Sequence, residues 1–107
     1  MSVNFEKYYK DGSAAVLVSP GFGAGWSTWA GKEAEAIMFD KNIVEFVRQE
    51  DFDGLEEYMQ STYPDVYLGG MKDLVVEWVP EGEAFEITEY DGSESLNIIS
   101  EQKYWIA

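Results

Sequence analysis

The chain has 107 residues and a formal net charge of −14, because 21 residues are Asp or Glu and only 7 are Lys or Arg. It contains no His and no Cys, which removes the imidazole and thiolate chemistry that enzymes most often use near neutral pH. Hydrophobic residues make up 46% and aromatic residues 16% of the chain, so its acidity does not indicate disorder. We expect one folded domain, residues 1–107, that is not an enzyme and needs no cofactor.

The first forty residues predict a hairpin, a loop and one ambiguous segment. Residues 3–10 suit a strand or a short helix, and the turn dipeptide Asp11-Gly12 would pair them with a buried strand over residues 14–19. Three alternating glycines make residues 21–29 an ordered loop, which its aromatic residues would hold in place. Residues 31–39 suit a helical turn or a strand.

Two short helices are predicted in the centre of the chain. Asp40 would cap a helix over residues 41–49, in which apolar residues recur at helical spacing. Asp53 would cap a second helix over residues 54–62, which Tyr63-Pro64 would end.

The last third of the chain predicts strands, at residues 74–79, 84–89, 95–99 and 103–106, with turns at residues 80–82 and 91–92. This spacing is typical of an antiparallel meander. The sequence as a whole predicts an α+β fold, in which an antiparallel meander sheet of four to five strands carries the two helices on one face.

The glycine-rich loop invites comparison with phosphate-binding loops, whose backbone N–H groups surround an anion. Its spacing fits neither common phosphate motif, and Lys32 is the nearest cation. The aromatic part of the loop offers a second interpretation, as a platform on which a sugar, a base or an Arg side chain could stack, or as anchors for a partner. The alternative is that its indoles fill the core. The residues concerned are Phe22, Trp26, Ser27, Thr28 and Trp29.

Carboxylates are too abundant for any single pair to indicate a catalytic site. The segment Asp51-x-Asp53-Gly54 resembles the start of a calcium loop, but the remaining ligands are out of register, so no metal site is predicted. The placement of the acids is more informative, because they form two runs without an intervening Lys or Arg. We predict a partner-binding acidic face at Glu77, Glu81, Glu83, Glu86, Glu89, Asp91 and Glu94, with a second patch at Glu50, Asp51 and Glu57.

The acids from Glu77 to Glu94 lie in predicted strands and turns, where their repulsion matters. Facing carboxylates repel each other across paired strands, so a hairpin without interleaved Lys is expected to use its negative field for binding. Such a field attracts basic protein surfaces and repels nucleic acid and anionic membranes.

Three segments resemble a set of small phage and prophage proteins: residues 21–29 (GFGAGWSTW), 73–82 (DLVVEWVPEG) and 89–96 (EYDGSESL). The resemblance carries over no established activity or functional residues. It implies a phage accessory protein in the cytoplasm of a bacterial host, of the kind that inhibits a defence protein (anti-CRISPR-like) or a DNA-handling protein. The expected partner is a basic, nucleic-acid-binding host protein whose nucleic-acid surface the acids would occupy. A small-ligand module and a virion structural or assembly protein remain alternatives.

Overall fold

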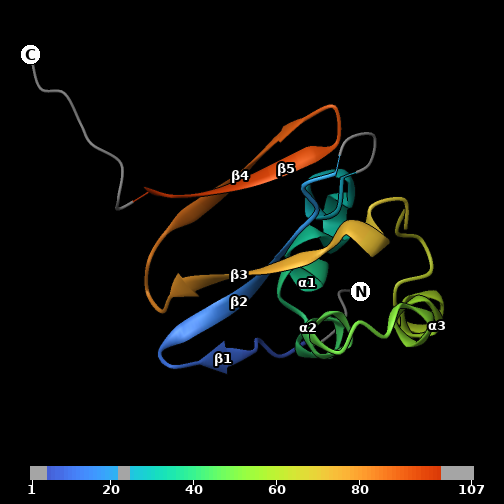
Figure 1. Ribbon diagram of the computed structural model, residues 1–107. Helices are drawn as coiled ribbons and strands as arrows, with labels where there is room; N and C mark the ends of the chain where they lie inside the picture. The colour runs from blue at the N-terminus through green and yellow to red at the C-terminus, as the bar shows by residue number, and fades with distance from the viewer. Residues whose placement is uncertain (1–4, 22–24, 100–107) are drawn as a thin grey trace, which may run out of the picture.

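The computed structural model describes residues 5–21 and 25–99, and over these ranges the fold is α+β, as predicted (Figure 1). Its described strands form two antiparallel sheets. The first sheet has the order β1-β2-β3, with β1 at Tyr9–Lys10, β2 at Ser13–Val18 and β3 at Val75–Pro80. The second is a hairpin of β4 (Phe85–Tyr90) and β5 (Ser93–Ile98).

Three α-helices lie between β2 and β3 in the described chain: α1 (Ala34–Phe39), α2 (Lys41–Arg48) and α3 (Phe52–Thr62). Short 3-10 helices are found at Ser27–Trp29 (η1), Gly31–Glu33 (η2) and Met71–Asp73 (η3). The ambiguous segment 31–39 is therefore helical. Asp40 caps α2 as predicted, since its Oδ1 accepts a hydrogen bond from the Asn42 N–H at 2.8 Å.

The predicted cap of the next helix was wrong by two residues. Asp51, not Asp53, caps α3, because its Oδ1 accepts from the Gly54 N–H at 3.0 Å. Glu50 ends the preceding segment in a left-handed conformation, with φ 56°, which brings Asp51 to the cap position and leaves Asp53 inside the first turn.

The predicted hairpin across Asp11-Gly12 is confirmed. Tyr9 pairs with Ala14 and Lys10 with Ser13, and both turn residues have positive φ, 51° and 78°, as a two-residue hairpin turn requires. Strand β2 then continues as the middle strand of its sheet, with Val18 opposite Val75 of β3. The predicted strand over residues 103–106 lies outside the described residues.

The strands do not continue as a single meander. β3 pairs with β2, and the turn after Pro80 carries the chain out of that sheet, so that β4 pairs with β5 alone within the described residues. In this turn Gly82 has φ 89° and the Glu83 N–H donates to the Pro80 carbonyl. Proline lacks an N–H, which makes it a suitable last residue for a strand that stops pairing.

The separation of the sheets buries β2 on both faces. Ala15 and Leu17 face the helices, whereas Val16 and Val18 face the hairpin, and all four are at most 1% exposed. In Figure 1 the β4-β5 hairpin lies above the β1-β2-β3 sheet and α2 and α3 lie toward the opposite side, whereas α1 reaches the hairpin, with the ring centroids of Phe39 and Phe85 5.9 Å apart. Apolar residues of the hairpin that pack on β2 and α1 are Phe85, Ile87, Leu96 and Ile98.

Candidate functional site

Glu94 is the centre of the most completely bonded polar site among the described residues. Its side chain is 2% exposed and lies beneath the loop that joins β2 to α1. Its Oε1 accepts from the Ser19 N–H at 3.0 Å, and its Oε2 accepts from the N–H groups of Trp26 (2.8 Å) and Thr28 (3.0 Å). The Thr28 hydroxyl donates a fourth bond to Oε2 at 2.5 Å.

The glycine-rich loop thus binds an anion, and that anion is the chain's own carboxylate. Backbone N–H groups converge on Glu94 much as they would on a bound phosphate. Two glycines let the backbone come this close: a Cβ on Gly25 would lie 2.8 Å from Thr28 Oγ1, and a Cβ on Gly70 would lie 2.8 Å from the Gly25 carbonyl oxygen. The described donors are committed to Glu94, so this loop offers them to no external phosphate.

The prediction that Glu94 belongs to an exposed binding face is wrong. In β5 it occupies the same face as Leu96 and Ile98, because side chains two residues apart in a strand point the same way. That face packs onto the β1-β2-β3 sheet. A partner cannot contact a carboxylate that is enclosed there.

Glu89 lies opposite Glu94 in the β4-β5 register and is also held by donors. Its Oε1 accepts from the Trp29 indole Nε1–H at 3.1 Å and from the Gly92 N–H at 2.9 Å. Unlike Glu94 it is exposed. The cross-strand pair of carboxylates is therefore offset locally by N–H donors, and the absence of Lys from this hairpin is not in itself a sign of a binding field.

The two loop tryptophans have different roles. Trp26 is 1% exposed and its indole Nε1–H donates to the Ile37 carbonyl at 2.9 Å, so it is a core residue that satisfies a carbonyl near the end of α1. Ser27 is buried beside it. Trp29 is 44% exposed and packs against Tyr67, with ring centroids 5.8 Å apart. Phe22 lies outside the described residues.

The sequence analysis did not predict a role for Tyr67. It is 57% exposed, and a Cβ on Gly69 would collide with its ring, so the glycine lets the ring fold back over the backbone. The available signal was an aromatic residue two positions before Gly69-Gly70. Nothing in the sequence pointed to its contact with Trp29, which lies 38 positions earlier.

A second buried carboxylate belongs to Asp40, which is 2% exposed. Its Oδ2 accepts from the hydroxyl groups of Tyr58 and Tyr63, each at 2.7 Å. Burial, followed by the hydrogen bond to Asp40, raises the pKa of the Tyr63 phenol far above its ordinary value, and the same causes raise the pKa of Tyr58. Both tyrosines therefore stay protonated as donors, and the network ties α2 to the end of α3.

The remaining predicted acids do not share one face. Glu86 alternates with Phe85 and Ile87 and so points away from the core, whereas half-buried Glu77 lies on the β3 face that meets the hairpin. Glu81 and Glu83 occupy the turn at one end of β4, and Asp91 the turn at the other. Eight of the ten predicted acids are exposed: Glu50, Asp51, Glu57, Glu81, Glu83, Glu86, Glu89 and Asp91.

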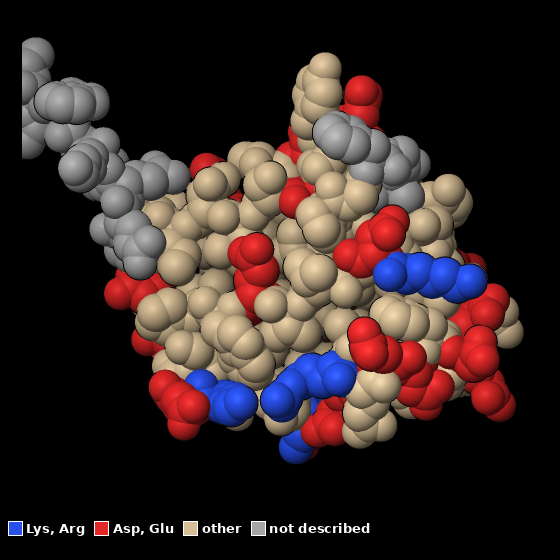
Figure 2. Space-filling view, in the orientation of Figure 1, with Lys and Arg blue, Asp and Glu red and all other residues tan. Residues whose placement is uncertain are grey.

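Basic side chains gather elsewhere. Arg48 of α2 lies over the rings of Tyr8 (5.3 Å) and Trp78 (5.8 Å) and donates a hydrogen bond to the Tyr8 hydroxyl. Lys7 lies 4.4 Å from the Phe39 ring centroid. In Figure 2 the visible Lys and Arg side chains lie along the lower edge, in the region of β1 and α2, and at the right side, while carboxylates are spread over several parts of the face.

Comparison with known proteins gives no family. No protein-family model matches the chain, and no curated protein or solved structure matches it.

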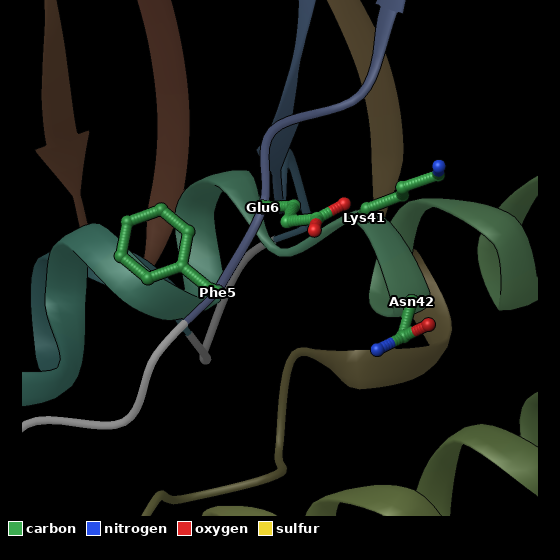
Figure 3. A pocket seen from close by; sticks show the side chains of 4 residues that line it. All are labelled: Phe5, Glu6, Lys41 and Asn42. Carbon is green, nitrogen blue, oxygen red and sulfur yellow. The ribbon is translucent and has the colours of Figure 1, made fainter.

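An open cavity of about 450 Å³ lies between the segment before β1 and the start of α2 (Figure 3). Its described lining is Phe5, Glu6, Lys41 and Asn42, none of which belongs to the glycine-rich loop that the alternative interpretation made a ligand site. Over residues 5–21 and 25–99 no three potential ligands gather for a metal ion. Within the same ranges no helix is long and apolar enough to cross a bilayer.

Proposed function

We propose that the protein is a non-enzymatic binding protein, which uses exposed carboxylates to occupy a basic, nucleic-acid-binding surface of another protein. The observation that carries the proposal is the division of the acids into two classes. Glu94 and Asp40 are buried and fully bonded, whereas eight of the ten predicted acids remain at the surface. Since a partner cannot reach the buried acids, the exposed ones are the groups that can contact its surface.

The exposed acids form three groups rather than one face. The first lies at the β3-β4 turn and along the outer face of β4, with Glu81, Glu83 and Glu86. The second lies at the β4-β5 end, with Glu89 and Asp91, and the third lies at the α2-α3 junction, with Glu50, Asp51 and Glu57. Separate groups of like charge favour fast, salt-sensitive association with an extended basic surface.

The biological setting is part of the proposal. The resemblance of three segments to small phage and prophage proteins supports an inhibitor of a host defence protein, in the manner of anti-CRISPR proteins, or of a DNA-handling protein in the bacterial cytoplasm. The buried indole of Trp26 is not available for stacking on a base or sugar, so the alternative ligand module would depend on exposed Trp29.

Affinity capture from bacterial lysate at low and high salt tests the proposal. We expect capture of a nucleic-acid-binding protein that is lost at high salt, and loss of this capture when Glu81, Glu83 and Glu86 are all changed to Lys. A control with the same charge change at Glu6, Glu35 and Asp65, which are also exposed, should retain most of the captured protein. If the two triple variants capture equal amounts of the partner protein, the position of the acids does not matter. That result would contradict a specific acidic surface.

A further inference from the structure

We propose that Trp29, Tyr67 and Glu89 form a receptor for the guanidinium group of an arginine side chain on the partner protein. The proposal rests on the proposed function for the identity of that partner, but the site itself is defined by contacts within the chain. It combines two exposed aromatic rings with a carboxylate whose position is fixed.

The rings are held in place although they face solvent. The centroids of Trp29 and Tyr67 are 5.8 Å apart with an interplanar angle of 30°. Gly25 lies directly against Trp29, since a Cβ there would come within 2.8 Å of the indole Cδ1. Gly69 lies against the Tyr67 ring, since a Cβ there would collide with the ring atoms. Pre-organised rings lose little conformational freedom when a ligand stacks on them.

Glu89 supplies the charge. Its Oε1 is occupied by the Trp29 indole and the Gly92 N–H, which orients the carboxylate along the edge of the indole ring. Its Oε2 accepts no hydrogen bond from the described residues, and the side chain is exposed. A guanidinium group lying against the rings can donate to this oxygen, which combines a cation–π contact with a charge-assisted hydrogen bond.

The same molecule contains an internal precedent for this arrangement. Arg48 lies over Tyr8 and Trp78, whose centroids are 5.9 Å apart, nearly the separation of the Trp29–Tyr67 pair. Arg48 thus shows that a Tyr–Trp pair of this spacing accommodates a guanidinium group. Among the described residues no Lys or Arg lies over Trp29 or Tyr67, so an arginine of the partner would complete the second pair.

Arginine is favoured over lysine because its planar group stacks on a ring while it donates in its own plane, whereas an ammonium group is a compact, strongly hydrated charge. An arginine-rich synthetic peptide and a lysine-rich peptide of equal length and charge therefore test the site. The readout is the indole N–H signal of Trp29 in two-dimensional NMR, assigned with Trp29→Phe, together with the dissociation constant from titration at low salt.

We expect the arginine peptide to bind about five- to tenfold more tightly than the lysine peptide and to shift the Trp29 signal. Glu89→Gln and Tyr67→Ala should each weaken arginine-peptide binding by about fivefold or more, while Glu6→Gln, an equal charge change at an exposed residue of the segment before β1, should change it less than about twofold. Equal binding of both peptides, or equal effects of Glu89→Gln and Glu6→Gln, would overturn the receptor. Either result would leave the proposed function to be decided by the lysate capture.

Discussion

Replacing Glu94 by glutamine tests the main structural conclusion, that the glycine-rich loop is built around an ionised carboxylate. The substitution preserves the shape of the side chain. The amide oxygen would take the position of Oε2, where three donors converge, so that the new NH₂ group would face the Ser19 N–H. One hydrogen bond becomes a donor–donor contact, and the other three lose a charged acceptor.

The expected cost follows from these four bonds. A hydrogen bond to a charged group contributes about 1.5–3 kcal/mol and a neutral one about 0.5–1.5 kcal/mol, so losing one and weakening three costs roughly 4.5–7.5 kcal/mol. Burying a neutral amide instead of a charge offsets part of this, which leaves a net loss of about 3 kcal/mol. For a chain of this size that loss lowers Tm by about 12 °C.

Thermal and urea unfolding followed by circular dichroism measure the loss, and amide hydrogen exchange locates it. Trp26 and Thr28 N–H groups should exchange faster in Glu94→Gln than in the unmodified protein, since their acceptor is weakened. Glu86→Gln is the matched control, because the same change on the exposed outer face of β4 should alter stability by no more than about 0.5 kcal/mol. A Glu94→Gln variant whose stability stays within that margin would show that the loop does not depend on a charged acceptor at Glu94.

Two further outcomes follow from the buried networks. Burial and hydrogen bonds to Asp40 raise the pKa values of Tyr58 and Tyr63 above the value of about 10 for an unfolded chain, so their contribution to stability is present below about pH 10 and is lost as the pH rises beyond it. The urea concentration at the unfolding midpoint should therefore decrease as the pH rises from about 9 to about 11, and it should decrease less in Tyr63→Phe. An equal decrease in the variant and in the unmodified protein would contradict a raised pKa for Tyr63. Trp26→Phe removes the donor to the Ile37 carbonyl and leaves a void, so unfolding should become easier by about 2–4 kcal/mol, whereas Trp29→Phe at the surface should cost less than about 1 kcal/mol; similar losses for both would be inconsistent with the different positions of the two indoles.

Elements that depend only on neighbouring residues could be predicted from the sequence. Asp11-Gly12 and Asp91-Gly92 supply the positive φ angles of two-residue turns, and the flanking β-branched and aromatic residues form the strands that those turns join. The cap at Asp40 and the stop at Tyr63-Pro64 likewise depend on neighbouring residues alone. The strand alternation even contained the signal that Glu94 shares a face with Leu96 and Ile98 and so points inward.

Strand pairing across long separations, and the position of each acid, depend on tertiary contacts that the sequence pattern does not show. Hydrophobic pattern marks β3 and β4 equally as strands, but the need to cover both faces of β2 folds the hairpin over the sheet instead of extending it. The hydrogen bond between the Trp26 N–H and Glu94 joins residues 68 positions apart, and no local pattern encodes it. Because a carboxylate's role depends on the donors that surround it, burial separated the structural acids from the exposed ones that we propose for binding.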